Sequence, residues 1–324
     1  MTIQLLWIPG LNLTVLKKNN KDLSIRMSSS LTGTSIELSP ALKSRAYVQL
    51  WKPRLSFLVA FSSLFGYILG TSGMINWPIA LTLFVGGFLV SGGAVTINQV
   101  IEKDLDSLMD RTRNRPIPTG LISSTEAIIF AIISGILGLI LLWISTNPLT
   151  VLLACSSFVL YSFVYTPLKR VGPIAVFVGA IPGALPPLLG WTAATGELSY
   201  MAFIIFGIQF IWQFPHFWAI AWVSDDDYKK AGFKLLPNGG KKDFGTAIQI
   251  MTYTLFLLPI SLLPAKFGLT GINSAFIAVL CGVLFLSQTF LLMKDPSRKS
   301  ALKIMFGSFL YLPIVQIAFM LDKV

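Results

Sequence analysis

The sequence is poor in charge, and this scarcity excludes several protein classes. Only 12% of its 324 residues are Asp, Glu, Lys or Arg, whereas a soluble domain carries roughly 25%. The mean hydropathy is +0.73, and the charged residues are too few to cover a globular surface. A soluble multidomain protein, a disordered chain and a coiled coil are therefore excluded, and the composition predicts an all-α polytopic membrane protein.

Cysteine, acidic residues and histidine are also scarce. The two cysteines, Cys155 and Cys281, lie in apolar runs without metal-ligand spacing, so neither a disulfide framework nor a zinc site is indicated. There are 14 acids against 25 basic residues, which gives a net charge of +11, and one histidine. A basic excess has several possible causes, among them nucleic acid binding, anionic substrates and the positive-inside bias of membrane loops.

Nine apolar runs are long enough to cross the roughly 30 Å of a bilayer core as helices. They lie between charged or Pro/Gly-rich breaks, and tryptophans fall near several of their ends, as interfacial anchors do. The predicted spans are 55–73, 78–100, 125–145, 149–166, 173–192, 200–222, 246–264, 272–293 and 303–321.

The positions of the basic residues predict the orientation of these spans. The N-terminal arm and the loops after the second, fourth, sixth and eighth spans hold 23 of the 25 basic residues, and only Lys266 and Lys323 fall on the other side. This split predicts a cytoplasmic N-terminus and a C-terminus on the opposite side. The net charge is then explained by topology, and nucleic acid binding has no support.

We divide the chain into an arm over 1–50 and a nine-helix domain over 51–324. The arm is polar and basic and has no span-length apolar run, so we expect it to be disordered. It shows no cleavable signal peptide; an organelle transit peptide, or initiation at Met27, are alternatives.

One acidic cluster follows the second span. Asn98, Glu102 and Asp106 are spaced i, i+4 and i+8, so a continuing helix places them in one stripe. Because like charges at this spacing repel, a cation such as Mg²⁺ would stabilise them. Arg111 and Arg115 follow and supply planar donors for phosphate oxygens. The pattern favours a Mg²⁺-diphosphate site, with Asn98, Glu102 and Asp106 as candidate metal ligands; Asp104 and Asp110 fall off the stripe.

A second acidic cluster, Asp225 to Asp227, follows the sixth span, and His216 lies eleven residues before Asp227. If the helix persists, His216 and Asp227 share a face, although Pro215 would open or kink it. His216 is a structural donor, a general base, a partner for the second carboxylate or a ligand to a metal-bearing substrate.

Lys169 and Arg170, in the loop after the fourth span, are further candidates for diphosphate binding. The alternative is that they only flank a span on the basic side.

Taken together, these motifs resemble those of the UbiA-type intramembrane prenyltransferases. Asn98, Glu102 and Asp106 followed by Arg111-Thr112 and Arg115-Pro116 are similar to the first acidic motif of that superfamily, in the form found in its protohaem IX farnesyltransferase (haem O synthase) branch. Three further stretches resemble the same branch: Tyr165 to Arg170, Gly183 to Trp191, and Trp212 to Trp218 with Asp227-Tyr228 and Ala231-Gly232. The whole match runs from about Leu50 to the C-terminus.

The resemblance implies a nine-helix bundle with a lateral chamber, in which farnesyl diphosphate binds through Mg²⁺ at the two motifs and haem b is the acceptor. The catalytic set it implies is Asp106, Asn98, Glu102, Asp227 and His216, with Arg111, Arg115, Lys169 and Arg170 on the diphosphate. It also implies that Asp227 joins Asn98, Glu102 and Asp106 as a metal ligand. Water addition would give haem O, destined for a haem-copper oxidase, with a haem A synthase as a potential partner. Because His216 stands where the superfamily usually has Asp, a symmetric two-metal site is not expected.

The membrane implied is the plasma membrane of a bacterium or, alternatively, the mitochondrial inner membrane. A prenyltransferase acting on a quinone precursor or a chlorophyll-type tetrapyrrole is the nearest alternative function. A secondary transporter would place ionisable groups near the bilayer midplane on broken helices, whereas here the acids lie at helix ends. A non-catalytic assembly factor gives no reason for the carboxylate stripe.

Overall fold

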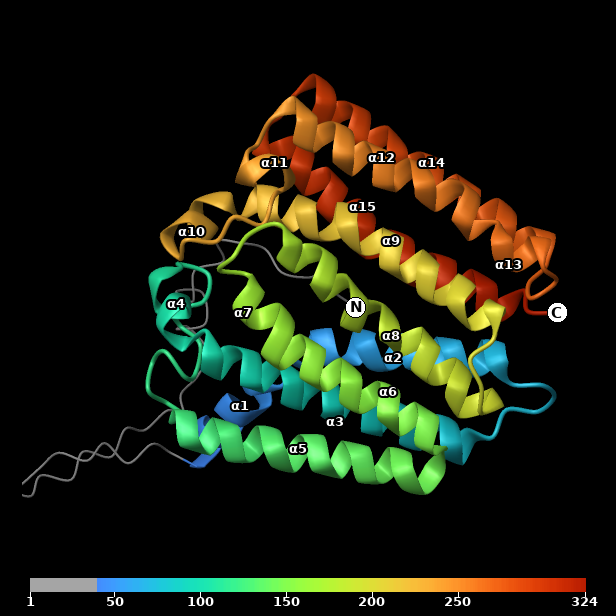
Figure 1. Cartoon of the computed structure of the whole chain (residues 1–324), viewed down its shortest axis with the longest axis horizontal. Coiled ribbons are helices and arrows are strands. Elements are labelled where there is room, and N and C mark those ends of the chain that lie inside the picture. Colours follow the sequence, from blue (N-terminus) through green and yellow to red (C-terminus); the bar gives the residue numbers. More distant parts are fainter. Residues whose placement is uncertain (1–39) are drawn as a thin grey trace, which may run out of the picture.

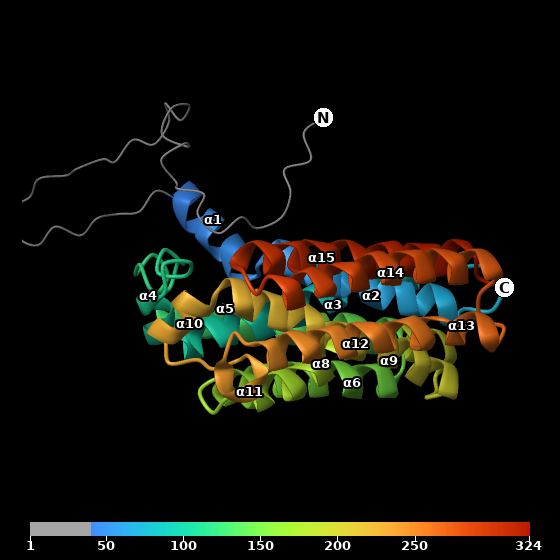
Figure 2. The same ribbon diagram turned by 90° about the horizontal axis from the view of Figure 1, so that it is seen from above.

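The computed structural model describes residues 40–324, all of whose regular elements are helices. The long helices run side by side and form a bundle (Figure 1), and the view from above shows them packed in more than one layer (Figure 2). The helices are α1 (Pro40–Leu50), α2 (Pro53–Gly70), α3 (Trp77–Ile101), α4 (Lys103–Leu108), α5 (Ser124–Ser145), α6 (Pro148–Val159), α7 (Thr166–Leu168), α8 (Ile174–Thr195), α9 (Tyr200–Val223), α10 (Asp225–Lys230), α11 (Pro237–Gly240), α12 (Phe244–Ser261), α13 (Leu263–Lys266), α14 (Ile272–Lys294) and α15 (Arg298–Leu321).

Nine helical segments among the described residues are long and apolar enough to cross a membrane, as predicted. Their lipid-facing side is visible on α5, where isoleucines such as Ile129, Ile133 and Ile136 are about half exposed. Apolar surface of this extent is typical of contact with lipid tails. The structure therefore confirms an all-α polytopic membrane protein.

Local sequence signals explain where the helices begin. The side chain of Ser123 accepts a hydrogen bond from the N–H of Glu126, whose carboxylate accepts the N–H of Ser123, a capping box that starts α5. Proline stands in the first turn of α2, α3 and α6, where no N–H partner is needed.

Small residues let α2 and α8 approach closely. A Cβ atom at Gly190 would overlap the carbonyl oxygen of Ser63, and one at Gly66 would overlap the carbonyl of Pro187. In a bilayer, close packing of this kind holds helices together, because lipid tails are as apolar as the side chains. This contact fixes α8 beside α2, the helix that starts directly after Lys52.

Three boundaries differ from the sequence predictions. The ninth span begins at Arg298, because Ser297 caps α15 and Arg298 Nε donates to the carbonyl of Val223 (3.2 Å). The fourth span is composite, since a π-helical turn over Leu160–Tyr165 separates α6 from α7. The predicted arm over 1–50 lies mostly outside the described residues, but its last eleven residues form α1 instead of being disordered.

The short elements α4, α10 and α11 gather at one end of the bundle, and the C-terminus lies at the other (Figure 1). Both acidic clusters belong to that first end. The side of the membrane that each end faces stays a prediction from the basic residues.

Candidate active site

The predicted stripe of Asn98, Glu102 and Asp106 lies at the junction of α3 and α4. Glu102 interrupts regular helix with φ −94° and ψ 6°. Even so, its N–H donates to the carbonyl of Asn98 (3.0 Å), and the N–H of Asp106 donates to the carbonyl of Glu102 (2.7 Å). The helical spacing is thus preserved across the break. All three side chains are buried, with exposures of 2%, 4% and 0%.

Each member of the stripe has a partner from another segment. Asn98 Nδ2 donates to Thr166 Oγ1 (3.0 Å), and Lys169 Nζ lies 2.9 Å from Glu102 Oε1. Arg115 Nη1 lies 2.5 Å from Asp106 Oδ2. Lys169, directly after α7, and Arg115, in the loop before α5, therefore each pair with one carboxylate of the stripe.

Lys169 is held by more than its ion pair. Its Nζ lies 4.7 Å from the centre of the Tyr165 ring, a cation–π distance. Burial alone would lower the pKa of Lys169, but the Glu102 carboxylate raises it above the ordinary value. Lys169 is therefore a fixed positive charge beside Glu102.

Lys52 is a functional candidate that sequence reasoning treated only as part of the basic arm. It joins α1 to α2 with φ 45° and ψ 65°, a left-handed conformation that costs a non-glycine residue energy. Burial, together with the charges of Arg115 and Lys169, lowers the pKa of Lys52 well below its ordinary value. Asp106 and Glu102 oppose that shift, so Lys52 belongs to the same cluster of charges.

The second acidic motif meets the first through Asp227. Its two carboxylate oxygens accept the backbone N–H groups of Asp110 and Arg111, each at 3.1 Å. Burial opposes ionisation of Asp227, but these hydrogen bonds and that from Lys230 (3.2 Å) lower its pKa. Asp227 is therefore an ionised anchor that holds the arginine segment in place.

Arg111 reaches across to α10. Its Nη2 lies 3.4 Å from the hydroxyl of Tyr228, and its guanidinium carbon lies 5.0 Å from the centre of that ring. The two motifs, more than a hundred residues apart in sequence, are thus joined by backbone and side-chain contacts at one end of the bundle (Figure 1).

The carboxylates suit a hard cation, although they do not form a closed cage. No group of three or more His, Cys, Asp or Glu residues within 40–324 is arranged to hold a metal ion. However, Asp106 Oδ1 is buried and has no hydrogen-bond partner among the described residues. Mg²⁺ commonly takes one or two carboxylates and completes its shell with water and substrate phosphate, so the donor set fits Mg²⁺ with a diphosphate.

His216 is not close to the second carboxylate cluster. Helix α9 continues through Pro215 to Val223, and Ser224 then breaks it before α10. The His216 ring instead stacks on Trp212 (ring centres 4.4 Å apart), and its Nδ1 lies 2.8 Å from Ser308 Oγ on α15.

The remaining charged candidates differ in the solvent exposure of their side chains. Arg170 is exposed and forms no ion pair with the described residues, unlike Lys169 beside it. Asp104 and Asp110 are exposed, as their position off the stripe predicts, and Asp110 pairs with Lys230. Asp225 is buried and pairs with Lys229 (2.8 Å) and Lys242 (3.1 Å), not with a cation of the stripe.

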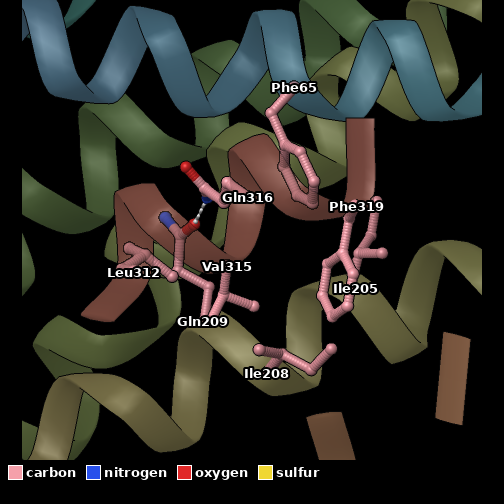
Figure 3. Close-up of a pocket in the computed structure, with 8 residues that line it drawn as sticks. All are labelled: Phe65, Ile205, Ile208, Gln209, Leu312, Val315, Gln316 and Phe319. Atoms are coloured by element: carbon pink, nitrogen blue, oxygen red, sulfur yellow. Dashed lines mark hydrogen bonds between the residues drawn. The ribbon is translucent and has the colours of Figure 1, made fainter. Parts of the chain in front are cut away.

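Two cavities lie outside this cluster. A small one of about 10 Å³ between α2, α9 and α15 is lined by apolar side chains and by Gln209 and Gln316 (Figure 3). It has room for about one water molecule. An open cleft of about 430 Å³ near α10 and α11 is lined by lysines together with Asp225 and Asp226.

Comparison with known proteins places this site in a family context. Residues 59–312 match the model of the UbiA prenyltransferase family. A protoheme IX farnesyltransferase from Cytophaga hutchinsonii is 53% identical over 280 residues, which cover 86% of this chain and 98% of that protein. The protein of the same name from Flavobacterium psychrophilum is 45% identical over 90% of this chain and 99% of its own length.

Solved structures agree on the fold. A digeranylgeranylglyceryl phosphate synthase superposes with a TM-score of 0.72 at 22% identity, covering 87% of this chain and 98% of that one. A UbiA homologue from Archaeoglobus fulgidus bound to GPP and Mg²⁺ gives a TM-score of 0.58 at 17% identity, covering 85% and 99%. From the matched family model and these relatives, we conclude that the chain belongs to the UbiA prenyltransferase family.

Proposed function

We propose that this protein transfers the farnesyl group of farnesyl diphosphate to a vinyl group of haem b, with addition of water, and so forms haem O and diphosphate. The observation that carries the proposal is the pairing of two buried carboxylates with Lys169 and Arg115 at one end of an apolar bundle. The acceptor is proposed because relatives named protoheme IX farnesyltransferase share up to 53% identity over most of the chain.

The cations would bind and neutralise the diphosphate. In this structure Arg115 pairs with Asp106 and Lys169 with Glu102, and Lys52 belongs to the same cluster of charges. A bound diphosphate would draw these three cations onto its oxygens, and Arg111 can join them because Asp227 fixes its backbone. Arg170 is exposed, and we propose no direct contact for it.

Asn98, Glu102, Asp106 and Asp227 remain the proposed metal ligands. Mg²⁺, when bound, would supply further neutralisation of the departing diphosphate. The buried Oδ1 of Asp106, which has no hydrogen-bond partner within 40–324, is the strongest support for this assignment. Asp227 offers less, because both its oxygens already accept backbone N–H groups.

The bond changes follow from charge. The bond between farnesyl C1 and oxygen breaks, and its electron pair leaves with the diphosphate, whose charge the cations stabilise. The vinyl π electrons form the new carbon–carbon bond to C1. Water then adds to the resulting cation beside the porphyrin and releases a proton. The apolar helices exclude water from C1 until the carbon–carbon bond has formed.

We further propose that the protein acts in the plasma membrane of a bacterium, with its N-terminus and both acidic motifs on the cytoplasmic side. The distribution of basic residues and the bacterial origin of the relatives support this placement. A haem A synthase, which would consume haem O, is the proposed downstream partner.

Incubation of the purified protein with farnesyl diphosphate and Mg²⁺ tests the acceptor. Haem b and an aromatic acid are supplied together, and the products are identified by mass spectrometry. Farnesylated, hydrated haem is expected. A prenylated aromatic acid would favour a quinone-precursor enzyme, and the absence of any prenyl transfer would refute the proposal.

A further inference from the structure

Where α9 packs on α15, the hydrogen bonds of Ser308 determine which ring nitrogen of His216 carries a hydrogen. His216 Nδ1 lies 2.8 Å from Ser308 Oγ. The hydroxyl of Ser308 in turn donates to the carbonyl of Met305, one turn earlier on α15, at 2.7 Å. Ser308 is fully buried, so no solvent competes for either bond.

A serine hydroxyl has one hydrogen, and here the carbonyl of Met305 takes it. With the hydroxyl donating to Met305, the 2.8 Å contact to His216 takes its hydrogen from the imidazole. His216 Nδ1 therefore carries the hydrogen and donates it to Ser308 Oγ. In the neutral ring this leaves Nε2 unprotonated, with its lone pair available.

The ring is also held by aromatic neighbours. Trp212 stacks on it at 4.4 Å, and the rings of Phe309 and Phe217 lie at 5.1 and 5.2 Å. The indole N–H of Trp212 donates to the carbonyl of Ser308 (3.0 Å), which ties the stack to α15. Nε2 forms no hydrogen bond with any residue in 40–324.

These surroundings favour metal ligation over proton transfer. A general base would become a cation, and no acidic side chain within the described residues pairs with His216. Burying an uncompensated charge is costly. A neutral imidazole that donates one N–H to an oxygen and presents its other nitrogen is the usual state of a histidine that ligates a metal.

We propose that Ser308 is a positioning residue that fixes the tautomer and orientation of His216, so that Nε2 ligates the iron of the haem acceptor. This inference rests on the proposed function. It gives the acceptor an anchor separate from the diphosphate cluster, and it assigns Ser308 a role in the acceptor half of the reaction only.

The test is haem binding by the purified protein, followed by absorption and resonance Raman spectra, without farnesyl diphosphate. His216→Ala should abolish the histidine-ligated spectrum, and free imidazole should restore it. Ser308→Ala should weaken haem binding by about 10–100-fold, the range for loss of a partner to a ligating histidine. Ser308→Thr, which keeps the hydroxyl, should retain the wild-type spectrum.

Ser62→Ala is the matched control. Ser62, on α2, is also buried and bonds to Gln316 on α15, but no hydrogen bond joins it to His216. It should leave the spectrum and haem affinity unchanged, and binding of inorganic diphosphate should be unchanged in every variant. A wild-type spectrum in His216→Ala or unchanged affinity in Ser308→Ala, in a protein that still converts haem, would overturn this inference alone. If the wild type neither binds nor converts haem, the proposed function fails with it.

Discussion

Replacing Asp106 with asparagine removes one negative charge from the cluster and keeps the shape of the side chain. The Asp106 side chain is 1% exposed, and that of Arg115 is 23% exposed, so the lost charge is poorly screened by water. Removing one preorganised electrostatic partner costs about 10²–10³-fold in kcat, or about 3–4 kcal/mol. We expect Asp106→Asn to reduce farnesyl transfer by at least this factor.

The same change should alter diphosphate binding in opposite directions with and without metal. In the wild type, Arg115 pairs with Asp106 and Lys169 with Glu102, and both carboxylates act on the charge of Lys52; in the variant only Glu102 remains charged. Without Mg²⁺, inorganic diphosphate should therefore bind the variant more tightly. With Mg²⁺, the gain in affinity that the metal gives the wild type should be lost.

Calorimetric titration of inorganic diphosphate, with and without Mg²⁺, measures both effects on protein shown to be folded by its thermal unfolding in detergent. Asp104→Asn is the matched control, since Asp104 is exposed two residues away; it should behave as wild type. Near-wild-type conversion by folded Asp106→Asn, or an unchanged Mg²⁺ effect, would remove Asp106 from the proposed metal site.

Three further predictions address other parts of the molecule. Lys52→Gln should weaken binding of farnesyl diphosphate by about 10–100-fold, because a hydrogen bond to a charged group contributes about 1.5–3 kcal/mol, while Lys52→Arg keeps the charge and most of the affinity; equal loss in both variants would point to backbone strain instead. Gly190→Ala should lower the unfolding temperature by forcing α8 from the carbonyl of Ser63, at about 1–3 kcal/mol, and an unchanged temperature would contradict the close contact. Hydrogen bonding to the N–H of Ser274 (2.7 Å) lowers the pKa of Asp322, so the stability it contributes is present above the ordinary carboxyl range and is lost as the pH falls through its folded pKa. The difference in unfolding temperature between wild type and Asp322→Ala should therefore shrink on acidification, and a difference independent of pH would refute this role.

Much of the fold follows from the sequence, because a bilayer demands long apolar helices. The nine spans were predictable from length and hydropathy, and the i, i+4, i+8 spacing predicted that Asn98, Glu102 and Asp106 share one face, which the structure shows to be buried. Asp104 and Asp110 were correctly separated from the stripe by the same geometry.

Contacts between distant segments were not predictable in this way. Lys52 looked like one basic residue among many, and only the left-handed backbone between α1 and α2 and the neighbouring charges reveal its place. Ser308 lies 92 residues from His216, and no periodicity links them. Lys169 and Arg170 are adjacent, but the end of α7 turns one toward Glu102 and leaves the other exposed.

The central claim, transfer of farnesyl from a diphosphate to a haem vinyl group with water addition, is tested most directly by a single turnover in ¹⁸O-labelled water. Purified protein, farnesyl diphosphate, Mg²⁺ and haem b are combined, and both products are analysed by mass spectrometry. The account predicts one ¹⁸O atom in the hydroxyethylfarnesyl haem and none in the released diphosphate, with the two formed in equal amounts. Labelled diphosphate, or diphosphate released without consumption of haem, would contradict it.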